Sequence, residues 1–220
     1  MILTTKNLRK EVPSGDSNLV ILDDITFNLE EGKSLAITGP SGSGKSTLLG
    51  LLAGLDTATS GDIVLDGIKL NLLNEEERAI LRKDKVGFVF QSFELLPSLT
   101  ALENVMLPSE LKSEENPKKK GEYFLERVGL SDRQNHYPNQ LSGGEQQRVA
   151  IARAFACSAK ILFADEPTGN LDQKNGKLIS DLLFEVNSET DNALVIVTHD
   201  QNLALQCDKK IELKLGKIVD

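Results

Sequence analysis

Short, unbroken runs of hydrophobic residues recur along the chain and predict buried strands. Runs of this length are typical of strands that are covered on both faces of a parallel sheet. The expected core strands are Leu35–Thr38, Val86–Phe90, Ile161–Ala164, Leu194–Thr198 and Ile211–Leu213.

Elsewhere the apolar residues are spaced three or four positions apart, which predicts helices. One helix is expected after Lys45, one after Asp172 and one after Asp200. The apolar positions of the first two are Leu48, Leu49, Leu51, Leu52 and Leu55, and then Ile179, Leu182, Leu183 and Val186. The stretch 92–157 is expected to be mostly helical, with interruptions at Pro97, Pro108, Pro117 and Pro138. Strands that alternate with helices indicate an α/β chain.

The N-terminal region has a different pattern and predicts an antiparallel β-subdomain. Strands are expected near Leu3, at Val20–Leu22 and at Ile25–Leu29, and Asp62–Leu65 adds a hairpin that turns at the following Asp-Gly pair. Glu75–Glu77 is expected to begin an exposed helix, because acidic side chains are favourable at a helix N-terminus.

Composition narrows the class of protein. The chain has 220 residues and a formal net charge of -8 at pH 7, whereas a nucleic-acid-binding protein would normally be basic. The one basic run, Lys118–Lys120, lies close to Glu114, Glu115 and Glu122, which favours a solvated surface over a phosphate-binding patch. One large α/β domain with an inserted lobe is expected at this length.

Cysteine usage and hydropathy indicate where the protein works. Cys157 and Cys207 are too few and too far apart for a metal site, so we expect free thiols in a reducing compartment. No apolar stretch approaches the ~18 residues of a membrane span. Lys6, Arg9 and Lys10 follow too little apolar sequence for a signal peptide. We therefore expect a cytoplasmic protein whose membrane contact goes through a partner.

Two glycine-rich segments carry the strongest chemical signal. The first, Gly39–Thr47, fits the nucleotide-binding pattern G-x-x-x-x-G-K-[ST] and lies between an expected strand and an expected helix. Its glycines let backbone N–H groups approach phosphates, and the helix N-terminus adds partial positive charge. Lys45 is expected to reach the β- and γ-phosphates, and the Ser46 hydroxyl to bind Mg²⁺. The strand and helix context disfavours the alternative of a chance glycine-serine loop.

The second segment is Leu141–Arg148, in which Ser142 is followed three residues later by Glu145. This spacing is typical of a capping box, which places Ser142 and the N–H groups of Gly143 and Gly144 at a positive helix end. An ordinary helix cap would explain Ser-x-x-Glu alone, but Leu-Ser-Gly-Gly-Glu followed by Gln-Gln-Arg is far more specific. The segment lacks a lysine. It indicates a second binding element for a γ-phosphate, so that two chains would bind the same phosphate.

Two carboxylates, Asp165 and Glu166, end the expected strand Ile161–Ala164. In an open parallel sheet the chemistry lies at the carboxyl ends of the strands. Adjacent strand residues point to opposite sides, so we expect different roles for the two. Asp165 suits the Mg²⁺ shell and Glu166 suits a general base that orients or deprotonates water. The alternative, a solvated turn, is weaker beside the lysine loop.

Together these segments resemble the ATP-binding subunits of ABC transporters, over essentially the whole chain. Leu141–Glu145 matches the family's signature sequence, Gln91 its glutamine loop, Asp172 its D-loop and His199 its switch histidine. The motifs follow the family's order and approximate spacing. The stretches 88–93, 101–105 and 167–172 are most similar to the LolD/MacB/FtsE branch, and within it to YbbA-type ATPases.

The resemblance implies a P-loop NTPase (RecA-like) ABC ATPase core with an antiparallel β-subdomain and an inserted α-helical subdomain. Residues 1–220 would form a single ABC ATPase domain. Within it, 1–91 and 158–220 would form the catalytic core with the β-subdomain, and 92–157 the helical signature subdomain.

The resemblance also implies an ATPase that uses ATP and Mg²⁺. The implied catalytic residues are Glu166, His199, Lys45 and Gln91. The implied nucleotide-binding residues are Gly39, Pro40, Ser41, Gly42, Ser43, Gly44, Lys45, Ser46, Thr47, Gln91, Ser142, Gly143, Gly144, Glu145 and Asp172. The implied Mg²⁺ ligands are Ser46, Gln91 and Asp165.

One position departs from the family pattern. The family usually stacks adenine on an aromatic residue ahead of the lysine loop, but residues 8–24 contain no Phe, Tyr or Trp, and Val12 occupies the corresponding position. We expect an aliphatic and weaker contact with the base, because aromatic stacking adds ~0.5–1.5 kcal/mol beyond area burial.

The implied partners follow from the family. Its signature helix faces the γ-phosphate that the other subunit binds, which implies a head-to-tail homodimer with ATP at the interface. A separately encoded integral membrane permease of the FtsX/MacB type is also implied, with this subunit peripheral on the inner face of the cell membrane, and no nucleic acid. Related systems tend to move or extract lipophilic cargo. A soluble ABC ATPase that serves assembly or cell-division machinery would use the same catalytic residues, so this alternative stays open.

Overall fold

The computed structural model describes residues 1–15, 17–190 and 192–219, and the chain forms two compact units. The first unit comprises Met1–Arg82 and Ala193–Asp220, and the second comprises Lys83–Asn192. These limits differ from the expected division at 91/92 and 157/158. That division concerns functional subdomains and stays a prediction.

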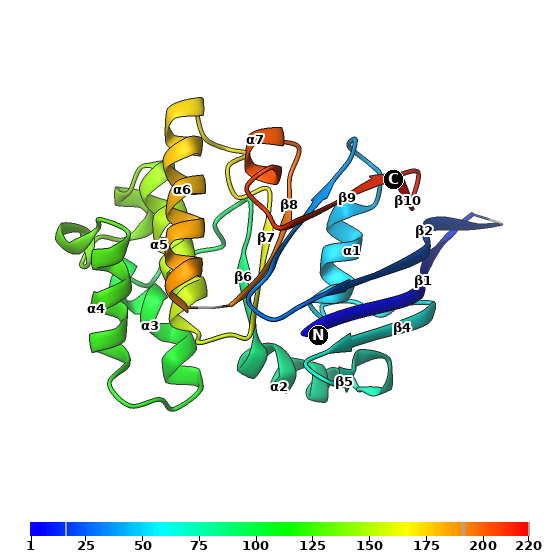
Figure 1. Cartoon of the computed structure of the whole chain (residues 1–220). Coiled ribbons are helices and arrows are strands. Elements are labelled where there is room, and N and C mark those ends of the chain that lie inside the picture. The colour runs from blue at the N-terminus through cyan, green and yellow to red at the C-terminus, as the bar shows by residue number, and fades with distance from the viewer. Residues whose placement is uncertain (16, 191, 220) are drawn as a thin grey trace. The chain divides into compact units, whose positions relative to one another are not determined.

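An antiparallel sheet forms much of the first unit. Its strands are β1 (Leu3–Ser14), β2 (Ser17–Leu29), β4 (Ser60–Leu65) and β5 (Ile68–Lys69), in the order β2-β1-β4-β5 (Figure 1). Leu3 lies opposite both Leu29 and Leu65, and all three side chains are fully buried. The expected antiparallel β-subdomain is therefore present, with longer strands than the sequence pattern predicts.

The first unit also contains parallel strands that carry the glycine loop. β3 (Ser34–Thr38) lies between β8 (Ala193–Val197) and β9 (Lys209–Lys214) and is parallel to both, while β10 (Lys217–Val219) is antiparallel to β9. Every residue of β3 and β8 is buried, as their unbroken apolar runs predict. Helix α1 (Lys45–Leu52) packs against β8, and the short helix α7 (Gln201–Ala204) packs against β3.

Two shorter elements complete this region. A 3₁₀ turn, η1 (Leu70–Leu72), precedes α2 (Glu75–Lys85), which begins in the first unit and ends in the second. The expected helix that starts at Glu75–Glu77 is therefore confirmed. Leu55 departs from its expected place on the first helix: α1 ends at Leu52, and the Leu55 side chain is 48% exposed. The Leu55 N–H closes a turn onto the carbonyl of Gly50 and ends the helical repeat.

The second unit combines two parallel strands with a helical cluster. β6 (Val86–Val89) pairs with β7 (Ile161–Asp165), with Val89 opposite Ala164. The helices are α3 (Ala101–Leu111), α4 (Pro117–Arg127), α5 (Gly143–Ala156) and α6 (Gln173–Thr190), with 3₁₀ turns η2 (Ser131–Arg133) and η3 (Pro138–Gln140). Helix α5 contacts α3, α4, α6 and β6 and is the centre of this unit.

Close packing explains why α5 lies against the strands. A Cβ at Gly87 of β6 would come within 2.9 Å of the Ala154 carbonyl and 3.1 Å of the Cys157 sulfur. Only a glycine lets the end of α5 approach the strand this closely. Most buried residues of α5 are apolar or small, such as Val149, Ala150, Ile151 and Ala154, and Gln147 is the buried polar residue of this helix.

The prolines of this unit have three different positions. Pro117 and Pro138 each begin a helical segment, and Pro97 lies in a loop. Pro108 lies inside α3, so the expectation that it interrupts the helix is wrong. A proline removes one backbone donor, and α3 tolerates this loss because buried Leu102 and Val105 hold it in the core.

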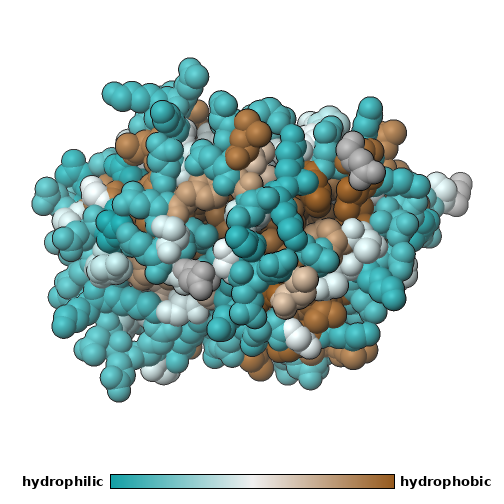
Figure 2. Space-filling model, in the orientation of Figure 1, coloured by the Kyte–Doolittle hydropathy of each residue, from teal (hydrophilic) through white to brown (hydrophobic). Residues whose placement is uncertain are grey.

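Hydrophilic residues dominate the face drawn in Figure 2, with apolar residues scattered between them. The most exposed large apolar side chains are Leu215, Leu72 and Leu205, at 89%, 78% and 77%. Within the described ranges, no helix has both the length and the apolarity needed to cross a membrane.

Candidate functional site

The glycine loop of the first unit has the geometry of a phosphate cradle. Gly39, Gly42 and Gly44 adopt φ angles of 141°, 76° and 99°. A Cβ at Gly39 would lie 2.1 Å from the Leu213 carbonyl, and one at Gly44 would lie 2.8 Å from the Leu22 side chain. The neighbouring strands therefore fix the loop from two sides, and its backbone N–H groups can turn inward as an anion site requires.

Two polar side chains inside the loop, Lys45 and Ser43, have hydrogen-bond donors that an anion could use. Lys45 is only 9% exposed, and its ammonium group donates to the carbonyls of Gly39 and Pro40 at 3.0 Å each. The hydroxyl of Ser43 is buried and has no hydrogen-bond partner in the described part of the chain. Lys45 also begins α1, where the first N–H groups of the helix favour negative charge. These features fit a nucleotide triphosphate.

The structure brings His199 to the same sheet edge as this loop. β3 and β8 are parallel, and Ile37 lies opposite Val197, so the segments that follow both strands leave the sheet side by side. His199 is exposed there. The next residue, Asp200, caps α7 by accepting from the N–H groups of Asn202 and Leu203.

The second unit has a corresponding edge, where Gln91 follows β6 and Asp165 ends β7. Glu166 lies beyond the strand and has a left-handed φ of 44°. The reasoning that alternation along one strand separates the two carboxylates is therefore wrong. The backbone turns sharply at Glu166, so strand alternation does not apply there, and the separate roles of the two carboxylates stay a prediction.

Two neighbouring residues draw Gln91 and Glu166 together. The Asn170 amide donates to the Gln91 carbonyl at 2.8 Å. A Cβ at Gly169 would lie 3.2 Å from the Gln91 amide nitrogen and 3.3 Å from the Glu166 Cβ. Asn170 and Gly169 were not expected from the sequence to be site residues. Their only signal was their position within the matched stretch 167–172.

The segment after Gln91 is held by side chains from distant positions. Phe93 and Glu94 have left-handed φ angles of 63° and 50°, and Arg153 of α5 donates to both of their carbonyls. Asn104, which is fully buried on α3, donates to the carbonyls of Leu96, Leu99 and Thr100 and accepts from the Leu96 N–H. Neither Arg153 nor Asn104 was expected from the sequence to shape the site.

The expected capping box at the start of α5 is confirmed. The Ser142 hydroxyl accepts from the Glu145 N–H at 3.3 Å, and Glu145 accepts from the Ser142 N–H at 2.8 Å. The Glu145 carboxylate accepts from the Ser142 N–H and also from the Ser142 hydroxyl, at 2.8 Å, and these two bonds, together with the bond from Arg133 at 3.0 Å, lower the pKa of Glu145 to about 2. Ser142 and Gly143 are exposed, so this helix end is open to a ligand or a partner.

Asp172 caps the start of α6. Its carboxylate accepts from the N–H groups of Lys174 and Asn175 at 3.0 Å each and from the Asn175 amide at 2.6 Å. These hydrogen bonds, chiefly from Asn175, lower the pKa of Asp172. A Cβ at Gly144 would lie 3.8 Å from the Asn175 amide, so Asp172 and the start of α5 are close neighbours within the second unit.

The expected site residues are divided between the two units. The loop 39–47 and His199 belong to the first, and Gln91, Asp165, Glu166, Asp172 and 141–145 belong to the second. Among the described residues, no group of three or more His, Cys, Asp or Glu could hold a metal ion. The expected Mg²⁺ ligands are the hydroxyl of Ser46, the amide of Gln91 and the carboxylate of Asp165. Such a set suits Mg²⁺, because this ion usually keeps several waters and takes phosphate oxygens as further ligands.

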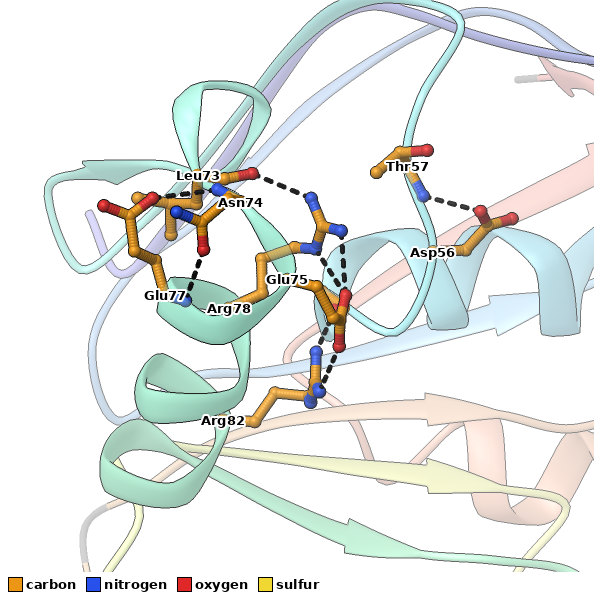
Figure 3. Close-up of polar contacts among 9 residues, drawn as sticks. Asp56, Thr57, Leu73, Asn74, Glu75, Glu77, Arg78 and Arg82 are labelled. Atoms are coloured by element: carbon orange, nitrogen blue, oxygen red, sulfur yellow. Dashed lines mark hydrogen bonds and ion pairs between the residues drawn. The ribbon is translucent and has the colours of Figure 1, made fainter.

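The walls of a small hollow in the first unit contain none of these residues. Its volume is about 60 Å³, and its walls include Leu51, Asp56, Ile63, Asn71 and Arg78. Figure 3 shows the polar groups beside it. Arg78 donates to Glu75 and to the Leu73 carbonyl, Arg82 donates to Glu75, and Asn74 and Glu77 form a reciprocal cap for α2. These groups are satisfied by one another and hold the helix start in place.

Comparison with known proteins agrees with this geometry. The model of the ABC transporter family matches residues 22–169. The chain is 49% identical to the ABC transporter ATP-binding protein YbbA of Escherichia coli K12, over 99% of this chain and 96% of that protein. It is 46% identical to the lipoprotein-releasing system ATP-binding protein LolD of Treponema denticola, over 99% of this chain and 97% of that protein.

Solved structures show the same fold. The ATP-binding cassette MJ0796 of Methanocaldococcus jannaschii, in a dimeric post-hydrolysis state bound to ADP and Pi, superimposes with a TM-score of 0.91 at 44% identity. The match covers 99% of this chain and 97% of that one. The P-loop NTPase fold expected from the sequence is confirmed. The chain belongs to the ABC transporter family, as one of its ATP-hydrolysing subunits that use ATP and Mg²⁺.

Proposed function

We propose that two copies of this chain close around ATP and that hydrolysis then drives a separate membrane permease. One observation carries the proposal. The chain supplies two different anion-facing elements, the glycine cradle with buried Lys45 and the exposed, capped helix start at Ser142. The similar cassette MJ0796 forms a dimer and binds ADP and Pi, which supports the same arrangement here.

Each element has its own part in binding. The N–H groups of 39–47 and the ammonium group of Lys45 bind the β- and γ-phosphates. Ser142, Gly143, Gly144 and Glu145 of the partner subunit face the γ-phosphate from the other side, and Asp172 lies beside them. The helix end at Ser142 contributes partial positive charge without a lysine.

The chemistry is assigned to the residues at the strand ends. Glu166 orients or deprotonates the attacking water, and His199 holds that water and the γ-phosphate. Ser46, Gln91 and Asp165 hold Mg²⁺. Bound there, Mg²⁺ would supply positive charge that offsets the negative charge developing on the transferred phosphoryl group. Gln91 lies at the start of segment 91–100, which Arg153 and Asn104 hold in place. Gln91 is therefore also the candidate residue that couples nucleotide binding to the permease.

The base site is the least specific part of the proposal. Val12 on β1 lies opposite Leu19 on β2, so an aliphatic surface is available for adenine. Aliphatic contact lacks the ~0.5–1.5 kcal/mol that aromatic stacking adds. The triphosphate contacts therefore carry most of the affinity for ATP.

The partner and cargo follow from the relatives. LolD is named as part of a lipoprotein-releasing system. We propose an FtsX/MacB-like permease as the partner, lipophilic cargo, and a position on the inner face of the cell membrane through that permease. The alternative, a soluble assembly or cell-division ATPase, makes a different prediction for purification. Recovery from membranes with a multi-span protein supports the permease, and recovery with soluble partners alone contradicts it.

Glu166→Gln tests the hydrolytic part. The change removes the base but keeps the size of the side chain, so kcat should fall by ~10²–10⁴. ATP binding should persist, and light scattering should show an ATP-dependent dimer that the wild-type protein dissolves by hydrolysis. An unchanged turnover rate would remove Glu166 from the mechanism.

A further inference from the structure

The backbone at Glu166 needs an external support. Its φ of 44° lies in the left-handed region, which non-glycine residues rarely adopt. Left-handed residues of this kind persist only when the surrounding structure over-determines them. The Gly169 N–H donates to the Glu166 carbonyl at 2.9 Å and closes a tight turn, but this bond lies within the turn itself.

The support comes from helix α5. Gln147, in the second turn of α5, donates its side-chain amide to the Pro167 carbonyl at 2.7 Å. Gln147 is fully buried, so this bond is shielded from water. Pro167 follows Glu166 directly, so the bond fixes the Pro167–Thr168 peptide, one residue beyond the proposed base.

The chemistry of Gln147 is unusual for a purely structural residue. Its other amide atom, Oε1, is buried and has no hydrogen-bond partner among the described residues. A buried polar atom that is left unpaired destabilises a fold, and an apolar side chain of the same shape would avoid the loss. Gln147 therefore makes one hydrogen bond, to the Pro167 carbonyl, while its unpaired Oε1 lowers the stability of the fold.

We infer that Gln147 is a positioning residue for hydrolysis, which sets the direction of the Glu166 carboxylate by holding the Pro167 carbonyl. The inference rests on the proposed role of Glu166 as the base. Because Gln147 and Ser142 share α5, the same helix carries the segment that faces the partner's nucleotide and the support for this subunit's base.

The test compares two substitutions in the full-length protein. Gln147→Met keeps the length of the side chain and removes the donor. A misplaced catalytic group costs up to ~10²-fold, so kcat should fall by about 10- to 100-fold. The Kd for ATP should change by less than about twofold, because the Gln147 side chain is fully buried and not accessible to a ligand. Equal losses in kcat and ATP affinity, or no loss in kcat, would overturn the inference.

Ser109→Ala is the matched control. The Ser109 hydroxyl is fully buried on α3 and donates to the carbonyl of Ala156, at the far end of α5, at 3.1 Å. The change also removes a buried bond to a backbone carbonyl, together with a contact to the Glu114 carboxylate, but away from Glu166. It should leave kcat unchanged. A fall in kcat as large as that of Gln147→Met would show that any loosening of α5 slows hydrolysis, and the specific role would be lost.

A double substitution separates this inference from the proposed function. If Gln147 acts through Glu166, adding Gln147→Met to Glu166→Gln should not slow single-turnover hydrolysis further. If the fold-losses in the single-turnover rate of the two single variants multiplied in the double variant, the inference would be overturned. Normal turnover by Glu166→Gln alone would instead contradict the proposed base. If Gln147→Met does not fold, Gln147→Asn, whose amide is one methylene too short to reach Pro167, should show the same fall in kcat.

Discussion

The two units shape their functional segments in different ways. In the first, the phosphate loop takes its left-handed turns at Gly39, Gly42 and Gly44, which need no support to do so. In the second, the left-handed residues of these segments are Phe93, Glu94 and Glu166. For each of these non-glycine residues, the left-handed conformation costs roughly 1–2 kcal/mol.

The source of the support differs accordingly. Lys45 bonds to carbonyls of its own loop, five and six residues away. The strained segments of the second unit are held by Arg153, which lies 59 and 60 residues from the carbonyls that it binds, and by Gln147, 20 residues from Pro167. Glycine encodes a shape locally, whereas a strained non-glycine segment depends on the packing of α5. The second unit is therefore the one whose catalytic geometry can respond to movement of a helix.

The largest expected effect tests the first half of this comparison. Gly39→Ala places a methyl group 2.1 Å from the Leu213 carbonyl, so the loop must shift. Overpacking and backbone strain together should lower the free energy of unfolding by about 2–4 kcal/mol. Denaturant unfolding and ATP binding measure the result, and ATP binding should be lost.

Gly42→Ala is the control for that change. Gly42 also has a left-handed φ, of 76°, but a Cβ there would meet nothing within 4 Å. Only the conformational strain applies, so the loss should be about 1–2 kcal/mol. Equal losses for the two variants would mean that the close approach to Leu213 does not shape the cradle.

An intermediate effect is expected in the second unit. Arg153→Met leaves the Phe93 and Glu94 carbonyls without their donor, which should lower the free energy of unfolding by about 1–3 kcal/mol. Arg127→Met removes an arginine that pairs with Glu185 and Glu189 on the surface, so it should lower the free energy of unfolding much less than Arg153→Met does. If denaturant unfolding showed the same loss of stability for both variants, the hydrogen bonds from Arg153 would stabilise the protein no more than a surface ion pair does.

The smallest effect concerns acid stability at the start of α5. Folding lowers the pKa of Glu145 from 4.5 to about 2, so its contribution is present above pH 4.5 and is lost as the pH falls toward 2. Solvent screening limits this contribution to about 1 kcal/mol. Unfolding curves of wild-type protein and Glu145→Gln should differ at pH 6 and converge near pH 2. A difference that is constant over this range would show that the capping carboxylate is not the cause.

Much of the architecture could be predicted from the sequence. The unbroken runs identified β3, β7 and β8, the Ser142–Glu145 spacing identified the cap of α5, and the pattern around Lys45 identified the cradle. These signals are local, because each depends on residues within one strand or one turn. The errors were also local in origin: Leu55 fits the helical spacing but lies past the end of α1, and Pro108 is tolerated inside α3.

The sequence by itself determined the identity of the phosphate loop, because glycines adopt left-handed turns without strain and a lysine at fixed spacing supplies the charge. Only the tertiary structure decided the conformation at Glu166 and after Gln91. A left-handed glutamate has no sequence signature of its own, since it is stable only when side chains from another helix pair with the neighbouring carbonyls. Gln147 and Arg153 acquire their importance from where the fold of α5 brings them.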